Sequence, residues 1–416
     1  MAAYTRKLQV IIVGSGLAGL ATARIIRESH DVTIYEKAGP DAATGGQGIS
    51  LSPNAIRILD SIGFDRERAG AVISSGYRSF DKDGHMRVDL EVDFVARYGA
   101  DLLTFKRSDF RDELFRLAMA SSDELGTPLN PVKFVSNNGV VDINPLEGIV
   151  TLADGSIVQG DVVIVADGIH SRLRAQILGS DQYVAKKMGA TCYRVALSVD
   201  RAKEVLGELP FWWDPTTNKN RPCMIEARDG SHRFIAAYAM RNSQYMNLSA
   251  VFPTPKDRAS SLDSWYAEAD RNEVLEVFRD FHEPVRKMLS AADELKMWDL
   301  QDIDPLPTWT KGRAILIGDA AHAMTPMQGQ GANMSIEDAE SFRLLTATVG
   351  PENVPIILKQ IDSIRRPRAS KVLEDTRAIS DKISLEEVIA KMDFNMSYKG
   401  IHEAMAKAKG DSDSSE

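Results

Sequence analysis

A glycine-rich turn near the amino terminus constrains the fold of this 416-residue chain more than any other feature. The apolar run 8–13 is typical of a buried strand, and residues 20–27 have helical character. Between them stands the sequence GSGLAG, whose glycines are Gly14, Gly16 and Gly19. A second strand over 31–35 ends at Glu36, about twenty positions after the turn. This order predicts a Rossmann-like βαβ unit at the start of an α/β protein.

The residue types in this unit suit a dinucleotide. Gly14 permits the tight turn, Gly16 lets the backbone approach a pyrophosphate, and Gly19 allows close packing of helix on strand. Glu36 would accept hydrogen bonds from the ribose hydroxyls of an adenosine. A glycine-rich turn that binds nothing is the remote alternative, because strand, helix and acidic residue are all in place.

Residues 313–339 form a second candidate ligand segment. The apolar run 314–317 predicts a strand buried on both faces, and Asp319 follows at its carboxyl end, where open α/β sheets bind ligands. Pro326 and the small residues Gly331 and Ala332 keep side chains away from a ligand and lead into a helix. A plain connection with an incidental aspartate would explain poorly why DAAH, the proline and GQGAN occur together.

Two more segments belong to the same expected site. The buried strand 161–166 runs into Asp167-Gly168, a second strand followed by Asp-Gly. Glycines crowded into 45–48, up to Gly48 and Ile49, indicate a loop where the backbone approaches a ligand, although a mobile surface loop would have the same composition. Several separate parts of the chain would thus assemble one nucleotide site.

Arg107 stands just ahead of a helix expected over 109–120, for which Ser108 is a fitting N-cap. There it could reach a phosphate with its forked guanidinium. A solvated surface arginine is an equally good interpretation of this residue taken alone.

Between roughly 185 and 300 the composition shifts, and aromatic and β-branched residues recur with period two over 191–197, 211–213, 233–238 and 246–252. This pattern predicts a second domain, a mostly antiparallel sheet with one face packed and one facing a cavity. Arg194 and Tyr238 lie in two of these strands, and together they could anchor an acidic or enolic substrate. Sequence alone slightly favours the alternative, in which Arg194 pairs with a structural carboxylate and Tyr238 belongs to the core or rim.

Composition narrows the classes of function. A formal charge of −9 without a long basic block argues against nucleic-acid binding. Two cysteines, Cys192 and Cys223, imply no disulfide framework, and the seven histidines show no metal-binding pattern. The run 10–26 contains polar residues and three glycines, so it resembles neither a membrane span nor a signal peptide. A cytoplasmic protein without membrane or metal, monomeric or homodimeric, is the expectation.

With these motifs assembled, the chain resembles the single-component FAD-dependent aromatic monooxygenases, the group of para-hydroxybenzoate and salicylate hydroxylases. The resemblance covers most of residues 8–345. It rests on GSGLAG with Glu36, on Arg107, on VADGIHSRLR at 165–174 and on GDAAHAMTPMQGQGAN at 318–333. It implies that Asp319 holds the ribityl chain of FAD and that Arg107 lies near its phosphates. The residues implied beside the isoalloxazine ring, or in handling FAD and the nicotinamide cofactor, are Gly48, Ile49, Asp167, Pro326, Gly331 and Ala332.

The resemblance also implies an arrangement of domains. A Rossmann-like FAD-binding domain would occupy 1–75, 106–184 and 301–345, and an inserted β-sheet substrate domain 76–105 and 185–300. C-terminal helices would follow over 346–409, and the acidic stretch 410–416 is expected to be a disordered tail.

The implied reaction is hydroxylation of an electron-rich aromatic or enolic small molecule. NADH or NADPH reduces FAD, O2 forms a C4a-hydroperoxide, and the substrate takes the distal oxygen. Such chemistry needs no nucleophile–base pair, and His322 fits a structural role in the DAAH turn. The matches of Arg194 and Tyr238 to substrate-positioning residues are the weakest part of the resemblance, because the spacing between them is longer here.

Other activities stay open at this point. Trp212-Trp213 does not reproduce the tryptophan motif of flavin halogenases, and no amphipathic anchor suggests a reductase of membrane-associated isoprenoids. An epoxidase, or a flavin-binding interaction protein without catalysis, would share the cofactor motifs.

Overall fold

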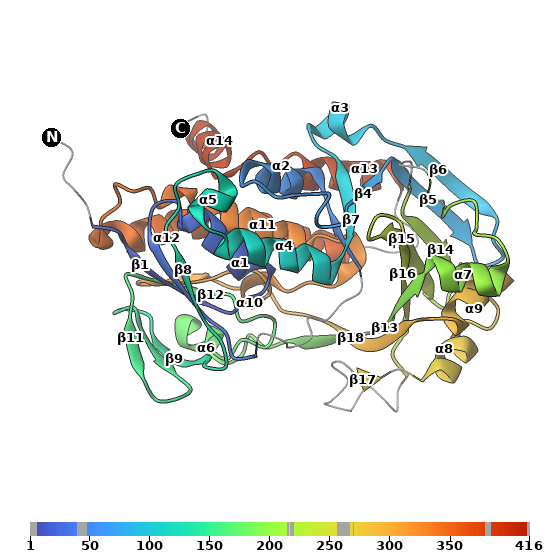
Figure 1. Cartoon of the computed structure of the whole chain (residues 1–416), viewed down its shortest axis with the longest axis horizontal. Coiled ribbons are helices and arrows are strands. Elements are labelled where there is room, and N and C mark those ends of the chain that lie inside the picture. Colours follow the sequence, from blue (N-terminus) through green and yellow to red (C-terminus); the bar gives the residue numbers. More distant parts are fainter. Residues whose placement is uncertain are drawn as a thin grey trace.

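The computed structural model describes residues 6–39, 48–213, 216, 220–255, 267–268, 270–378 and 384–413. Two large sheets stand side by side with helices around them (Figure 1). This confirms the predicted α/β fold, with a Rossmann-like part and an inserted sheet.

The first sheet has the strand order β19-β20-β12-β1-β2-β8, and all neighbours except β19 and β20 are parallel. The strands are β1 (Gln9–Val13), β2 (Asp31–Tyr35), β8 (Val132–Val135), β12 (Val162–Val165), β19 (Thr310–Lys311) and β20 (Ala314–Leu316). Val13 pairs with Val165, and Val165 pairs with Leu316. The turns after β1, β12 and β20 therefore leave the same edge of the sheet, where doubly wound folds bind their ligands.

Helices α1 (Leu17–Ile26), α4 (Arg107–Met119) and α11 (Gly331–Ser341) pack together over this sheet (Figure 1). Every residue of α1 is buried, which is why it shows no polar face in the sequence. Helix α4 begins two residues earlier than expected, so Ser108 lies inside it and Lys106 is the N-cap.

The second sheet has eight strands in the order β17-β18-β13-β16-β15-β14-β5-β6, antiparallel except between β14 and β5. The strands are β5 (Gly76–Asp81), β6 (Met86–Glu91), β13 (Lys186–Ser198), β14 (Cys223–Glu226), β15 (Phe234–Met240), β16 (Tyr245–Pro253), β17 (Ala267–Glu268) and β18 (Glu294–Asp302). One face packs through Tyr193, Val195 and Leu197 in a core that also holds apolar residues of α7 (Val199–Leu206), α8 (Arg271–Val277) and α9 (Glu283–Ser290). The opposite face carries Arg194 and Tyr238.

The predicted strand over 211–213 is wrong. Pro210 begins a turn there, closed by a hydrogen bond from the Trp213 amide to the Pro210 carbonyl, 2.8 Å long. Trp213 is buried and its indole donates to the Ser243 carbonyl at 3.1 Å. The aromatic run belongs to a turn that is held in place by a buried tryptophan. An alternation of residue types with period two does not distinguish such a turn from a strand.

Two smaller sheets complete the fold. β3 (Gly48–Leu51), β4 (Val72–Ser74) and β7 (Leu102–Lys106) form one. All of β7 except Lys106 falls in the segment 76–105 that was expected to belong to the substrate domain, yet β7 does not join the substrate sheet. β9 (Val140–Asn144), β10 (Ile149–Leu152) and β11 (Ile157–Gln159) form an antiparallel meander. Short helices α2 (Pro53–Ser61), α3 (Phe94–Tyr98), α5 (Ser122–Leu125) and α6 (Arg174–Leu178) connect these parts.

The carboxyl-terminal part is helical, with α12 (Val354–Arg377), α13 (Leu385–Met396) and α14 (Ile401–Asp413). The disordered tail expected over 410–416 is wrong for 410–413, which belong to α14, and 414–416 lie outside the described residues. Once a helix is nucleated, each further residue adds a hydrogen bond, so a polar composition alone does not end it. Among the described residues, none of the helices reaches the length and apolarity that a membrane crossing requires. Cys192 and Cys223 are both free and buried.

Candidate flavin and substrate site

The glycines of the turn at 14–19 allow the tight turn and the close helix–strand packing that the sequence predicted. Gly14 has φ +99°, and a Cβ there would lie 2.6 Å from the Ala166 carbonyl oxygen. A Cβ on Gly19 would lie 2.2 Å from the Gly14 oxygen, whereas one on Gly16 would meet nothing within 4 Å. Gly14 and Gly19 are thus required by the protein itself, and Gly16 leaves open space at the start of α1.

Glu36 lies at the end of β2 and reaches this turn. Its Oε2 accepts from the Ser15 amide at 2.8 Å and from the Ser15 hydroxyl at 2.9 Å. Arg111 of α4 donates to the same hydroxyl at 3.3 Å. Sequence reasoning missed Ser15 and Arg111, although Arg111 stands four residues after Arg107, and therefore on the same side of the helix.

Arg107 is the first residue of α4 and is half-buried. Its neighbour Lys106 pairs with Gly48 in the ladder between β7 and β3. Arg107 therefore lies beside the beginning of β3, between the glycine turn that Arg111 contacts and the segment expected to meet the flavin ring. Residues 45–47 of that predicted loop lie outside the described residues.

Asp319 begins the short helix α10 (Asp319–His322) and is exposed at the carboxyl edge of the first sheet. Arg174 fastens this turn to the Asp167-Gly168 loop, since its Nε donates to the Ala320 carbonyl at 2.7 Å and its Nη2 to the Ile169 carbonyl at 2.8 Å. The turn after β12, Asp167-Gly168, and the turn after β20, Gly318-Asp319, are therefore in contact. Arg174 was part of the quoted motif, but sequence reasoning gave it no role.

One carboxylate oxygen of Asp167, Oδ1, is a buried hydrogen-bond acceptor without a donor among the described residues. Burial raises the pKa of Asp167, and a hydrogen bond from Ser171 opposes that shift. A buried oxygen without a partner is rare in folded proteins, and a bound ligand that donates a hydrogen bond would satisfy it.

A buried charge network lies behind the Asp319 turn. Asp338 of α11 accepts from the Gly318 amide at 2.9 Å and lies 2.6 Å from His322 Nε2. Arg365 of α12 pairs with Asp338 at 3.1 Å and with Glu337. His322 therefore has the structural role predicted for it, in holding the DAAH turn against α11.

The two segments expected beside the isoalloxazine are tied together. Asn333 of α11 accepts from the Ser52 amide at 2.7 Å, and Gln330 donates to the Ser52 hydroxyl at 3.2 Å. Ser52 directly follows β3, which begins with Gly48 and Ile49. Pro326 begins the 3-10 helix η1 (Pro326–Gln328), and Gly331 and Ala332 begin α11. All five predicted ring-lining residues thus belong to neighbouring segments.

The substrate sheet meets these segments directly. A Cβ on Gly48 would lie 2.6 Å from the Tyr238 hydroxyl oxygen and 2.7 Å from Asn247 Cγ. Met327 of η1 packs against an apolar cluster of the same sheet that contains Cys192, Val251 and Leu300. The face that carries Arg194 and Tyr238 is consequently the face toward β3 and η1, the segments predicted to lie beside the flavin.

Arg194 lacks the structural partner that the sequence slightly favoured. Within the described ranges no carboxylate forms a salt bridge with it, and its Nε has no hydrogen-bond partner. Its guanidinium carbon lies 5.3 Å from the centre of the Trp298 ring. Burial raises the pKa of Tyr238 to about 12, although the charge of Arg194 acts in the opposite direction.

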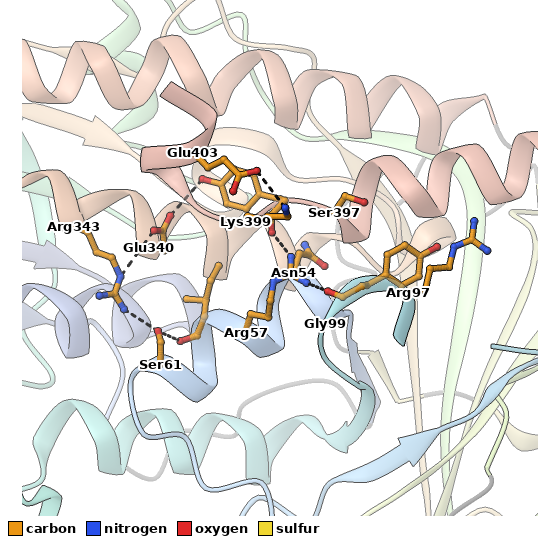
Figure 2. A pocket seen from close by; sticks show the side chains of 13 residues that line it. Asn54, Arg57, Ser61, Arg97, Gly99, Glu340, Arg343, Ser397, Lys399 and Glu403 are labelled. Atoms are coloured by element: carbon orange, nitrogen blue, oxygen red, sulfur yellow. Dashed lines mark hydrogen bonds and ion pairs between the residues drawn. The ribbon is translucent and has the colours of Figure 1, made fainter. Parts of the chain in front are cut away.

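A large cavity elsewhere is distinct from this site. It has a volume of about 660 Å³ and lies between α2, α3, η2 (Phe342–Leu344) and the start of α14 (Figure 2). Most of its polar side chains hold the protein together: Arg57 donates to the carbonyls of Tyr98, Met396 and Tyr398. Glu340 accepts from the Ile401 amide at 2.8 Å. This cavity lies where α14 and the segment before it pack against α2 and α3, and none of the predicted site residues lines it.

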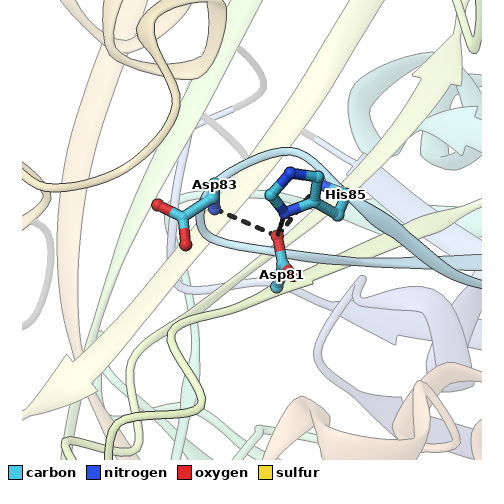
Figure 3. A group of neighbouring side chains, drawn as sticks. All are labelled: Asp81, Asp83 and His85. Carbon is cyan, nitrogen blue, oxygen red and sulfur yellow. Dashed lines mark hydrogen bonds and ion pairs between the residues drawn. The ribbon is translucent and has the colours of Figure 1, made fainter.

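Asp81, Asp83 and His85 gather at the turn between β5 and β6 (Figure 3). Asp81 Oδ1 accepts from the backbone amides of Asp83, at 3.2 Å, and of His85, at 2.9 Å. These bonds close the hairpin turn and account for the arrangement, so we assign no metal to it.

The residues at the sheet edge fit FAD. The open space at Gly16, the unpartnered Asp167 oxygen and the exposed Asp319 carboxylate follow one another along the carboxyl ends of β1, β12 and β20. Pyrophosphate at a helix amino end and a hydroxyl-rich chain beside a carboxylate are the contacts such a site offers.

Comparisons with known proteins agree with this geometry. The FAD binding domain family matches residues 7–376. A 6-hydroxynicotinate 3-monooxygenase from Pseudomonas fluorescens is 30% identical over 374 residues, covering 88% of this chain and 89% of the relative. Hispidin-3-hydroxylase from Neonothopanus nambi is 28% identical, covering 90% and 89%. A salicylate hydroxylase substrate complex has a TM-score of 0.75 at 25% identity, covering 96% of this chain and 97% of that structure. The chain therefore belongs to the FAD binding domain family and is an FAD-dependent monooxygenase of the aromatic hydroxylase group.

Proposed function

We propose that this enzyme hydroxylates a small aromatic or enolic molecule that carries an acidic group. The observation that carries the proposal is Arg194, a partly buried guanidinium with no carboxylate partner among the described residues, on the sheet face that meets Gly48 and Met327. A buried cation costs free energy unless an anion pairs with it, and a substrate carboxylate or enolate would supply that anion.

FAD, when bound, supplies the activation of O2 with electrons from NADH or NADPH, and one oxygen atom enters the substrate while the other leaves as water. The side chains of this protein then have to bind the substrate, orient it and keep water away from it. Arg194 binds the acidic group and Tyr238 exchanges a hydrogen bond with a ring hydroxyl. Gly48 and Met327 close the space between sheet and flavin to water.

The relatives act on molecules of this chemical class. Their names state 6-hydroxynicotinate, hispidin and 3-amino-4-hydroxybenzoate as substrates. Two of these three are ring carboxylates with a hydroxyl substituent, which supports an acid anchor without identifying the substrate here. A monomeric or homodimeric state and a cytoplasmic location stay predictions from the sequence, which does not choose between NADH and NADPH.

Replacing Arg194 with glutamine tests the anchor. We expect R194Q to retain FAD and to raise KM for a hydroxybenzoate-type acid about 10- to 100-fold, because a hydrogen bond to a charged group contributes about 1.5–3 kcal/mol. KM and FAD content would be measured beside R201Q, which removes an exposed arginine of α7 paired with Glu204.

The neutral methyl ester of the same acid serves as a second control, since it lacks the charge that Arg194 would bind. R194Q should change its KM little. An unchanged KM for the free acid in R194Q would show that Arg194 does not hold the substrate.

A further inference from the structure

The carboxyl-terminal helix α13 reaches the segment that lines the expected flavin ring. Asn395, near its end, donates from Nδ2 to Gln328 Oε1 at 2.9 Å. Gln328 is the last residue of η1, and its own Nε2 donates to Thr376 Oγ1 of α12 at 3.0 Å. One side chain of η1 is thus held by two different helices from the end of the chain.

The other side of η1 faces the substrate sheet. Met327 packs against the apolar cluster around Cys192 and Leu300, one residue before Gln328. Because neighbouring residues in so short a helix point to different sides, holding Gln328 also fixes how far Met327 reaches toward the sheet. The distance between the flavin-lining segment and the substrate face then depends on the hydrogen bonds to Gln328.

Asn395 is itself held firmly. The residue is 4% exposed, and its backbone carbonyl accepts a hydrogen bond from Arg368 Nη2 at 2.9 Å. Arg368 also pairs with Glu337 of α11 at 2.7 Å, so α11, α12 and α13 are joined at this point. A side chain on so rigid a support can define the position of a neighbouring segment.

We propose that Asn395 is a positioning residue, which sets the place of η1 relative to the bound flavin and the substrate through Gln328. This inference rests on the proposed function, since it takes η1 to line the flavin. It also gives the carboxyl-terminal helices a part in catalysis, although none of their residues lies in the site.

Replacing Asn395 with alanine tests this role. N395A should keep stoichiometric FAD, change the visible spectrum and midpoint potential of the bound flavin, and lower product formed per NAD(P)H oxidised. A displacement of reacting groups by about 1 Å can cost up to about 100-fold in rate, so a drop in kcat of about tenfold or more is expected with KM less affected. N395Q, which keeps the amide, should recover part of the coupling.

Asp393→Asn is the matched control. Asp393 lies on the same helix but binds Arg97 and Tyr98 of α3 instead of η1, at 2.9 and 2.7 Å. D393N should lower thermal stability and leave the flavin spectrum unchanged. A spectral change in D393N equal to that in N395A, or a change in Tm alone in N395A, would overturn the proposal.

Thr376→Val keeps the proposal testable if N395A loses FAD or fails to fold. It removes the hydrogen bond from Gln328 Nε2 to Thr376 and leaves that amide only the longer one, 3.4 Å, to the Val372 carbonyl. Its flavin spectrum should therefore shift as well, and an unchanged spectrum would refute the role of Gln328. The wild-type protein separates this inference from the proposed function: without flavin or coupled turnover in the wild type, the proposed function itself fails.

Discussion

At the scale of single residues, the sequence predicted the strands on which Arg194 and Tyr238 lie, but not the partners that their side chains contact. Period-two patterning placed both on strands of one sheet, and the register of β13, β15 and β16 puts them on the same face. Whether Arg194 has a carboxylate partner depends on residues far apart in the chain. Among the described residues no carboxylate forms a salt bridge with it, unlike in the alternative that the sequence slightly favoured. Ser15 and Arg111 were missed for the same reason, since their contact joins α4 to the glycine turn.

The ionisation of Tyr238 gives a prediction at this scale. Its pKa is raised to about 12, so the phenol stays protonated from neutral pH up to about pH 11 and can donate a hydrogen bond throughout. Y238F should lower kcat/KM by a similar factor at every pH between about 6 and 10, leaving the shape of the profile unchanged. An ionisation near the ordinary tyrosine value that is present in the wild type and lost in Y238F would contradict this assignment.

At the scale of elements, the glycine turn was the most predictable part of the chain. Its local sequence determines its conformation, since Gly14 has a positive φ and Gly19 packs against Gly14 and Ile12 of the same unit. The strand expected at 211–213 failed because its buried tryptophan packs in a turn. The docking of α13 on η1 could not be foreseen either, since amphipathic patterning does not tell which surface a helix covers.

Two alanine substitutions separate folding from cofactor binding in this turn. In G19A the new Cβ would lie 2.2 Å from a backbone oxygen, so we expect a loss of stability of about 1–3 kcal/mol or more, as for other overpacked sites. In G16A the Cβ meets no protein atom within 4 Å, so the apoprotein should keep its Tm while FAD affinity falls. Thermal melts with and without added FAD would measure both effects. Full FAD affinity in G16A would show that the pyrophosphate does not approach Gly16.

At the scale of the whole molecule, two sheets and a group of carboxyl-terminal helices converge on η1 and β3. Figure 1 shows the two sheets side by side. Gly14, Asp167 and Asp319 lie just beyond three strand ends of the first sheet, and Arg194 and Tyr238 lie on one face of the second. The motifs predicted the first group because each is local in sequence. Period-two patterning predicted the strands of Arg194 and Tyr238, whereas the packing of their face against β3 and η1, and the α13 contact behind η1, join distant segments and are not encoded in residue spacing.

Product formation under ¹⁸O2 tests the central claim most directly. The purified protein, with its flavin spectrum recorded, would be given NADH or NADPH and a panel of hydroxylated aromatic acids beside their methyl esters. We predict that an acid from the panel accelerates nicotinamide oxidation more than its ester does, and that its product gains a single labelled oxygen atom. Nicotinamide oxidation that no acid accelerates, or a product without label from a flavin-loaded protein, would contradict the assignment of this chain as a monooxygenase of acidic aromatic or enolic substrates.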